Sequence, residues 1–179
     1  ELPEEILQLK KLKELDLSKV QITSYTGTNG TSTYSTNYSQ NAIPPNAFSV
    51  YGKEYPLSKI ILPLSLEEIG SAAFSFCSKL YEINIPSNVK ILNGFYNCYN
   101  LKKINIPNSV TQINAFCFKN CYNLENVNIS NSVTQIGEYA FQNCLTFTDI
   151  NIPNSVTSIG RNAFDSCKNV KKVNIPASV

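Results

Sequence analysis

Residues 153–167 read PNSVTSIGRNAFDSC, and variants of this stretch recur along most of the chain. Each variant ends in a cysteine, and the five cysteines are separated by 21, 23, 23 and 23 residues: Cys77, Cys98, Cys121, Cys144 and Cys167. A fixed period of this length is typical of repeat arrays, in which each unit buries its apolar side only against its neighbours. The chain is therefore predicted to form a solenoid of stacked units.

Apolar residues recur at fixed places around each cysteine. A phenylalanine stands three residues before it, at Phe74, Phe95, Phe118, Phe141 and Phe164. Two aliphatic residues separated by one polar residue follow it, as in Ile150 and Ile152, and this period of two indicates one face of a short strand. A proline ends that strand in these units, except where Ser130 replaces it, because proline cannot donate a hydrogen bond to a ladder.

The segment of each unit that leads up to its cysteine is predicted to be a short helix or turn. In residues 138–144, EYAFQNC, the inward residues Ala140, Phe141 and Cys144 fall at helical spacing. Each unit is thus expected to run strand, turn, short helix, turn. The fold class that follows is α/β, a solenoid with seven parallel strands on a concave face and short helices or turns on the convex face.

The repeated residues resemble a known repeat family. Residues 152–160, IPNSVTSIG, and 163–167, AFDSC, are similar to the BspA-like class of leucine-rich repeats, found in surface proteins of bacteria and of protist parasites. The resemblance implies a leucine-rich-repeat solenoid. It also implies surface attachment, because members implicated in adhesion bind host matrix proteins or other cells. Residues 12–18, LKELDLS, instead resemble ordinary leucine-rich repeats.

We interpret residues 1–179 as a single domain with three parts. Residues 1–22 form an ordinary-type repeat, 23–41 a mobile insertion, and 42–179 the BspA-like repeats. The tract 23–40 has no apolar period and is mostly Thr, Ser, Asn, Gly and Tyr, which is typical of a surface excursion and predicts early cleavage by protease. Because Pro176 opens another unit, further repeats or a cap are expected in the full protein.

Composition limits the possible functions. The net charge is +2, with 15 Lys and Arg and 13 Asp and Glu spread along the chain, so no basic run favours nucleic acid or an anionic membrane. No apolar run approaches the roughly 20 residues that span a bilayer. There is no His to activate a Ser or Cys nucleophile, no Gly-rich phosphate loop, and no distinct carboxylate pair. We therefore predict no enzymatic activity, no cofactor or metal, no nucleic-acid partner and no direct membrane insertion of this fragment.

The cysteine column is expected to face inward beside the phenylalanines, because free cysteine packs as a small hydrophobe. We favour a ladder of buried, reduced thiols. Disulfides are an alternative, since stacked units place neighbouring columns about 5 Å apart, although their Cβ vectors would run parallel. Metal binding is another, since Cys117 and Cys121 form an i, i+4 pair.

The outward strand positions supply the candidate binding site. The residue between the two strand aliphatics is asparagine in five successive units, with Asp16 and Ile61 in the earlier ones. Such residues point to the concave face, where stacked amides can hydrogen-bond to one another or contact a ligand. The candidate ligand-binding residues are this column and the column beside it: Glu82, Asn84, Lys103, Asn105, Asn126, Asn128, Asp149, Asn151, Lys172 and Asn174.

Two smaller features have alternative interpretations. Tyr99 and Tyr122 share a register, where they either form an exposed aromatic patch or cover the neighbouring turn. The triplets at Asn29, Asn37 and Asn128 fit glycosylation sequons, which also arise by chance in an Asn-rich chain.

These features predict a protein-binding or adhesion module that presents a concave strand surface to a macromolecular ligand. The resemblance implies a host matrix protein or another cell surface as partner, and a cell-surface or secreted location, with the cytoplasm as the alternative. An intracellular scaffold and a recruiting array within a larger protein are the other functions considered.

Overall fold

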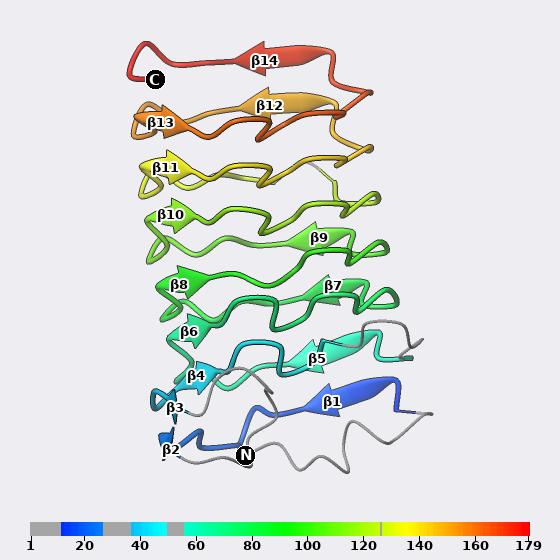
Figure 1. Cartoon of the computed structure of the whole chain (residues 1–179), viewed down its shortest axis with the longest axis vertical. Helices are drawn as coiled ribbons and strands as arrows, with labels where there is room; N and C mark the ends of the chain where they lie inside the picture. The colour runs from blue at the N-terminus through cyan, green and yellow to red at the C-terminus, as the bar shows by residue number, and fades with distance from the viewer. Residues whose placement is uncertain (1–11, 27–36, 50–55, 126) are drawn as a thin grey trace.

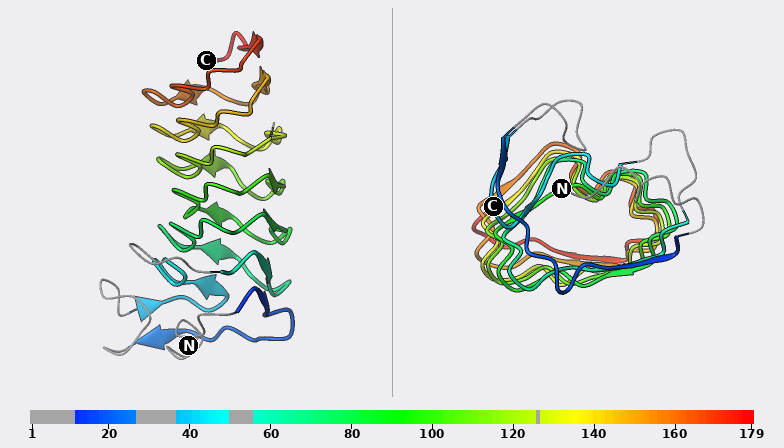
Figure 2. Two further views of the ribbon diagram at one scale, coloured as in Figure 1. Left: turned by 90° about the vertical axis from the view of Figure 1, so that its right-hand side faces the viewer. Right: turned by 90° about the horizontal axis from the view of Figure 1, so that it is seen from below.

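The protein winds into one stack of coils, with one coil for each repeat (Figure 1). The structure is a computed structural model, and it describes residues 12–26, 37–49, 56–125 and 127–179. Figures 1 and 2 show the coils stacked along a nearly straight axis. The end-on view in Figure 2 shows each coil as a flattened loop.

One side of the stack carries the parallel strands predicted from the sequence. The strands β1 (Glu14–Asp16), β5 (Lys59–Ile61), β7 (Glu82–Ile83) and β9 (Lys103–Ile104) pair in this order. Further along, β12 (Asp149–Asn151) pairs with β14 (Lys172–Asn174). The register joins equivalent positions of successive repeats, as in Lys59 with Glu82.

Among the described residues, one of the seven expected strands is not present. Between β9 and β12, residues 127–129 are not in strand conformation, and residue 126 lies outside the described part of the chain. This is the unit in which Ser130 replaces proline. The first sheet is therefore interrupted at this coil.

The return path of each coil forms a second parallel sheet, which the sequence analysis did not anticipate. Its order is β4 (Ala42–Ile43), β6 (Glu68–Ile69), β8 (Ile91–Leu92), β10 (Gln112–Ile113), β11 (Gln135–Ile136) and β13 (Ser158–Ile159). In β8, β10 and β11 the first side chain is exposed and the second is buried. Most coils therefore have a strand on each of two sides of the core.

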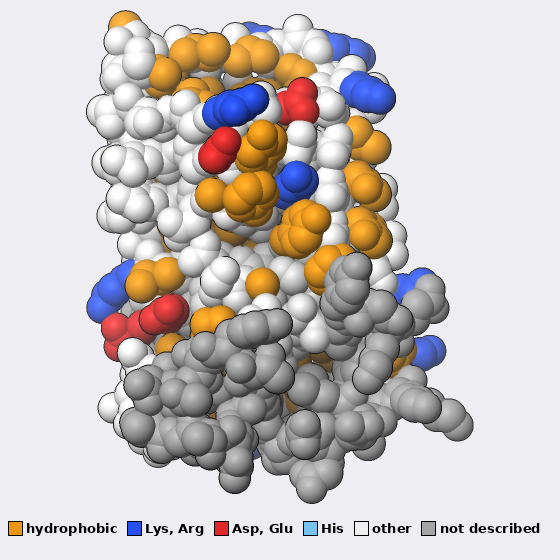
Figure 3. Space-filling view, in the orientation of Figure 1, with side chains coloured by type: hydrophobic (Ala, Val, Ile, Leu, Met, Phe, Trp, Pro, Cys, Tyr) orange, Lys and Arg blue, Asp and Glu red, His pale blue; other side chains and the backbone are white. Residues whose placement is uncertain are grey.

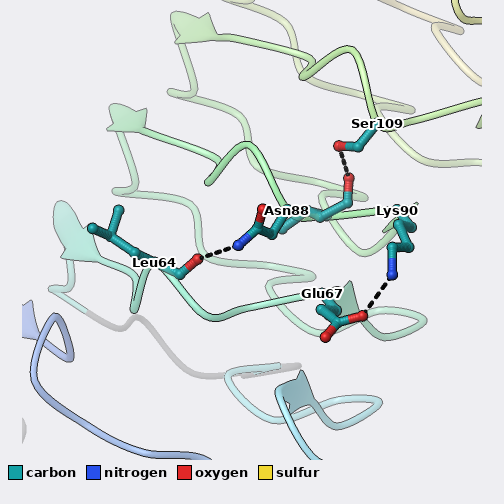
Figure 4. A network of polar contacts seen from close by, with 6 residues as sticks. Leu64, Glu67, Asn88, Lys90 and Ser109 are labelled. Atoms are coloured by element: carbon teal, nitrogen blue, oxygen red, sulfur yellow. Dashed lines mark hydrogen bonds and ion pairs between the residues drawn. The ribbon is translucent and has the colours of Figure 1, made fainter.

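Polar side chains tie successive coils together at the turn before this second sheet (Figure 4). The Asn88 side chain donates to the Leu64 carbonyl at 3.1 Å, and Lys90 Nζ lies 2.8 Å from Glu67 Oε2. The Ser109 hydroxyl donates to the Val89 carbonyl. Ser155 and Ser178 repeat this last contact at 2.7 Å, which accounts for the serine of the repeated PNSV segment.

An aromatic stack forms the centre of the core. Phe48, Phe74, Phe95, Phe118, Phe141 and Phe164 stack face to face with ring centroids 5.0 to 5.6 Å apart. All but Phe164, which is half-buried, are buried. Each ring therefore packs against the equivalent ring of the next coil, and such offset or stacked pairs contribute beyond simple area burial.

The cysteines have a structural role in this core. Each thiol of the column donates to the phenylalanine carbonyl of the preceding coil, as in Cys98 to Phe74 at 3.1 Å and Cys121 to Phe95 at 3.2 Å. The Phe74 carbonyl, for example, also accepts a hydrogen bond from the backbone N–H of Cys77 in its own coil. Both lone pairs of the carbonyl oxygen are therefore used. Cysteine is small enough for the site and supplies this second donor.

The predicted burial of the thiols is confirmed for five of the six cysteines. All six are free, and only Cys167, near the end of the stack, is half-buried rather than buried.

The α/β class with short helices is wrong, because the described residues form no helix and the convex side consists of turns. In residues 138–144, Tyr139 and Asn143 have φ of 56° and 62°, in the left-handed region that interrupts a right-handed helix. Their amides donate to the next coil, at Arg161 and Asp165. Hydrogen bonds between coils thus replace those within a helix, and the fold is a β-solenoid.

The tract predicted as an insertion leaves and rejoins the stack at one place. Its ends form a short antiparallel ladder of β2 (Tyr25–Thr26) with β3 (Asn37–Tyr38). The Asn41 amide donates to the Ile22 carbonyl at 3.0 Å. Residues 27–36, which include the Asn29 sequon, lie outside the described residues, so the predicted mobility of 23–41 stays a prediction.

Candidate functional site

The outward side chains of the first sheet form a surface that we call the strand face. Alternation along each strand decides which side chains reach it: in β12, Asp149 and Asn151 are exposed while Ile150 between them is buried. The described members of the predicted site are all exposed: Glu82, Asn84, Lys103, Asn105, Asn128, Asp149, Asn151, Lys172 and Asn174. Asn126 lies outside the described residues.

Charges alternate along one row of the strand face. In register, Glu14 pairs with Lys59, Lys59 with Glu82, and Glu82 with Lys103. Asp149 and Lys172 continue the alternation beyond the interruption. Lys59 Nζ lies 3.9 Å from Glu14 Oε2, and both side chains are more than half exposed. Such exposed pairs contribute about 0–1 kcal/mol to stability, so a partner can replace them at little cost.

The asparagine column forms only part of the predicted amide ladder. Among the described residues, one amide-to-amide hydrogen bond joins this column, from Asn174 Nδ2 to Asn151 Oδ1 at 3.1 Å. The amides of Asn84, Asn105 and Asn128 therefore remain available to a ligand.

A second asparagine ladder on the turn side was missed by the sequence analysis. Asn120 Nδ2 donates to Asn97 Oδ1, and Asn143 Nδ2 to Asn120 Oδ1, both at 2.7 Å. These residues precede their cysteines and all have positive φ, which asparagine tolerates better than most residues. The recurrence of asparagine before three successive cysteines was the available signal.

Two hollows open on the strand face and collect candidate residues from adjacent coils. One, of about 390 Å³, is lined by Glu82, Asn84, Lys103, Asn105 and Asn128 together with Lys102 and Glu125. The other, of about 560 Å³, lies around Ser130 and is lined mainly by amides, including Asn128, Asn151 and Asn174. It coincides with the interruption of the first sheet. The structure thus brings seven of the predicted residues into two depressions that share Asn128, whereas Asp149 and Lys172 line neither of them.

A third hollow, of about 480 Å³, contains residues that the sequence analysis did not select. Its lining includes Ile61, Leu64, Tyr81 and Lys59, together with Glu82 and Asn84 of the predicted site. Ile61 was recognised only as an exception in the asparagine column. The signal that was missed is that one unit replaces two outward polar positions with aliphatic residues.

Tyr99 and Tyr122 stack at the edge of the coils, with ring centroids 5.1 Å apart. Tyr122 is 38% exposed and Tyr99 is half-buried. Burial and the neighbouring Tyr122 raise the pKa of Tyr99. Neither tyrosine lines the hollows described above.

The turn side carries a separate aromatic cluster. Phe116, which is 43% exposed, stacks on Tyr139, and Lys119 Nζ lies 4.9 Å from the Tyr139 ring centroid. Figure 3 shows hydrophobic side chains gathered over the middle coils of this side, next to basic and acidic side chains. The Lys119 ammonium and the two rings contact one another, so their cation–π and stacking interactions are made within the cluster.

The exposed side chains of these surfaces offer hydrogen-bonding groups, charges and apolar contacts. In residues 12–26, 37–49, 56–125 and 127–179, no group of three or more His, Cys, Asp or Glu side chains could hold a metal ion. Five thiols are buried and Cys167 is half-buried, and burial raises the pKa of Cys77 to about 12 and that of Cys167 to about 11. Within the same described ranges there is no helix long and apolar enough to cross a membrane.

Stacked coils of about 23 residues, in-register parallel strands and an exposed strand face together define a leucine-rich-repeat protein. The chain belongs to the BspA-type leucine-rich-repeat family, since the model of the BspA type leucine rich repeat region matches residues 7–94 and 92–179. The resemblance seen in the sequence is thereby confirmed.

Solved structures of bacterial leucine-rich-repeat proteins are similar to this chain. A protein from Bacteroides ovatus is 32% identical with a TM-score of 0.61, over 87% of this chain and 40% of that one. One from T. pallidum is 28% identical with a TM-score of 0.61, over 78% and 61%. A leucine rich cell surface protein from Faecalibacterium prausnitzii is 28% identical with a TM-score of 0.58, over 90% and 47%.

The chain therefore spans less than two thirds of the length of each of these proteins. No curated protein matches the sequence.

Proposed function

We propose that this chain is a protein-binding module that engages its partner through the strand face, at the cell surface or after secretion. Leucine-rich-repeat proteins are generally protein-interaction modules, which supports the first part. The second part is supported by the similar protein from F. prausnitzii, which is described as a cell surface protein. A host matrix protein or another cell surface is the partner class that fits both parts.

One observation carries the proposal: exposed polar side chains of successive coils converge on common hollows of the strand face. Asn128 borders both polar hollows, which link residues from Glu82 to Asn174. The backbone of this face is held by parallel pairing of β7 with β9 before the break in the first sheet, and of β12 with β14 after it. A surface that is already ordered lowers the entropic cost of binding a large partner.

The charge pattern indicates how the partner would be selected. Glu82 and Lys103 alternate in sign, as do Asp149 and Lys172, so the strand face has no strong field of one sign. Long-range steering is weak on such a surface. Selectivity then depends on the match of hydrogen bonds and individual charges across the contact.

Charge reversal on the strand face tests this proposal. A variant with Lys103→Glu and Asp149→Lys should be destabilised by at most about 1 kcal/mol for each altered pair, because both side chains are exposed even though each new charge faces a like charge across the strands. It should bind candidate matrix proteins, or intact cells, about tenfold more weakly or worse. Surface plasmon resonance with purified matrix proteins and a cell-adhesion assay would measure this.

The matched control exchanges the same charges away from the strand face, with Glu138→Lys and Lys168→Glu, both at exposed positions. This control should bind as the parent chain does. Normal binding by the Lys103 and Asp149 variant, combined with loss of binding after changes at Tyr99 and Tyr122, would place recognition elsewhere on the solenoid.

An intracellular scaffold or a recruiting array would use the same face. Fractionation of the source cells separates these roles from a surface role, because only a surface protein would be cleaved by protease added outside intact cells.

A further inference from the structure

We propose that the hollow around Ser130 on the strand face binds a neutral glycan carried by the partner protein. This inference rests on the proposed function. It adds the chemical class of one group that the strand face recognises, and it places that group at the coil between β9 and β12 (Figure 1).

The hollow lies at the repeat that departs from its siblings at the turn after the strand. Five other repeats carry proline at this position: Pro63, Pro86, Pro107, Pro153 and Pro176. Ser130 lacks the proline ring, and its hydroxyl donates to Asn108 Oδ1 of the preceding coil at 2.8 Å. The space left at this coil, about 560 Å³, lies within the range of about 300–1,000 Å³ that is usual for small-ligand sites.

The lining of this hollow is polar and carries no charge. It consists of six asparagines, two serines and three apolar residues, and the asparagines are Asn108, Asn128, Asn131, Asn151, Asn154 and Asn174. A charged group placed here would lose contact with water without gaining contact with an opposite charge, which is unfavourable. The lining therefore favours a neutral ligand.

The ionisable side chains nearby lie to one side of the hollow. On the strand side of the same coils they are Lys102, Lys103, Glu125, Asp149, Lys171 and Lys172. Each stands two or three residues before the outward asparagine of its coil, and none of them lines the hollow. Lys102 Nζ lies 3.2 Å from Glu125 Oε1, and Asp149 is in register with Lys172. A sulfated probe tests whether the remaining lysines attract an anionic ligand instead.

The amides of the lining suit a ligand rich in hydroxyl groups. The side-chain nitrogen of asparagine donates two hydrogen bonds and its oxygen accepts two. Asn128, Asn131 and Asn154 are exposed, so their amides are open to a bound molecule. An apolar group covering them would leave donors and acceptors without partners, which weakens binding. A hydroxyl group both donates and accepts, so it matches either end of each amide.

The spacing and shape of the lining favour a glycan over a peptide segment. Asn151 and Asn174 pair in register across parallel strands, which places equivalent positions about 4.8 Å apart. Equivalent backbone groups of an extended peptide recur at every second residue, about 6.6 Å apart, so a peptide lying along the stack loses register with the amides. The lining also offers little apolar surface for peptide side chains, since Ile129 is 8% exposed and Ile152 is 2% exposed. The hydroxyls of a sugar ring stand on adjacent carbons and can reach several neighbouring amides.

Neutral oligosaccharides test the proposal on the full chain. The probes are tetrasaccharides of glucose, mannose, galactose and N-acetylglucosamine, each titrated into isotope-labelled protein and followed by nuclear magnetic resonance. The side-chain NH₂ signals of asparagine report directly on the hollow. At least one probe should shift the signals of Asn128, Asn131 and Asn154 saturably, with a Kd of about 10 mM or tighter.

Two variants separate the space of the hollow from its amides. Ser130→Pro introduces the residue of the sibling repeats, whose ring occupies part of the space. Asn131→Ser with Asn154→Ser introduces the residue found at the equivalent position as Ser87, and it removes two amides while the space remains. Both variants should fold, because sibling repeats carry these residues, and each should bind the responsive probe at least about fivefold more weakly. If Ser130→Pro does not fold, the serine pair alone decides.

The matched control is Asn100→Thr with Asn169→Thr, which removes two exposed asparagines that do not line this hollow. Each of them donates to a backbone carbonyl of the preceding coil, and Thr146 makes the same contact at the equivalent position. Threonine is therefore compatible with the fold at these positions. The control should keep its affinity for the probe within about twofold.

Four results would overturn the proposal. They are the absence of a saturable shift with any neutral probe, unchanged affinity in a folded hollow variant, tighter binding of a sulfated tetrasaccharide than of the neutral ones, and equally tight binding of a tetraglycine peptide with blocked ends.

Failure of the glycan site is distinguishable from failure of the proposed function. Matrix proteins that bind equally well after glycosidase treatment, but more weakly to the variant with Lys103→Glu and Asp149→Lys, would leave the protein-binding role in place and overturn the glycan site.

Discussion

Alkaline pH is expected to destabilise this protein through its buried thiols. Burial raises the pKa of Cys77 from its ordinary value of 9.0 to about 12, and raises those of Cys98, Cys121 and Cys144 well above 9.0. Cys117 is raised for the same reason. Because the folded pKa lies above the unfolded value, the stability from each neutral thiol is complete below about pH 9 and is lost as the pH rises toward 12.

The size of the effect at pH 10 depends mainly on the unfolded chain. There each thiol is about nine-tenths ionised, whereas the five fully buried thiols of the folded protein remain neutral. Relative to pH 7, ionisation lowers the free energy of the unfolded state by about 1.4 kcal/mol for each such thiol. The five thiols together lower the free energy of unfolding by about 7 kcal/mol. A typical domain is stable by only about 5–15 kcal/mol, so much of the folding free energy should disappear.

Urea unfolding followed by circular dichroism, with a reducing agent at pH 7, 8, 9 and 10, measures this loss. The matched variant is Cys121→Ala. At pH 7 it should be less stable by about 1–3 kcal/mol, because it loses packing and the hydrogen bond to the Phe95 carbonyl. Between pH 7 and 10 it should lose about 1.4 kcal/mol less than the parent chain.

The comparison with this variant isolates the thiols from other titrating groups. The pKa of Tyr99 is raised by burial, and that of Lys102 is raised by its hydrogen bond to Glu125. Both groups titrate at higher pH and are retained in the variant, so they cancel in the difference. A parent chain that loses less than about 2 kcal/mol by pH 10, or a variant with the same pH dependence as the parent, would refute the reasoning.

Two further predictions concern the core. Phe118→Leu should destabilise the protein by about 2–4 kcal/mol and Phe164→Leu by about 1–2 kcal/mol. The reason is that Phe118 is buried with rings stacked on both sides, whereas Phe164 is half-buried at the end of the stack. Equal losses of stability in urea unfolding would contradict the role of stacking. Alkylation without denaturant, followed by mass spectrometry, should modify Cys167 before any other cysteine, since it is the one thiol that is not fully buried, and earlier labelling of Cys77 or Cys121 would be inconsistent with the burial described.

The sequence by itself determined the repeat, the inward columns and the outward strand residues. These features depend on local geometry: a period of two places Asp149 and Asn151 on one side of a strand and Ile150 on the other, whatever the rest of the chain does. Repetition then extends the pattern to every coil, because a unit that cannot bury its apolar side alone must stack on its neighbours. The exposure of the candidate site residues followed from this reasoning.

Only the tertiary structure decided the conformation of the turns and the shape of the binding face. Helical spacing in residues 138–144 was misleading because Tyr139 and Asn143 take left-handed conformations and donate their amides to the next coil. The second sheet also depends on contacts between coils, because its strands, such as β10, β11 and β13, pair with equivalent strands about 23 residues away. The hollows at Asn128 and Ile61 are lined by side chains from different coils. Contacts between coils depend on how the units stack in space, and spacing within one unit carries no information about them.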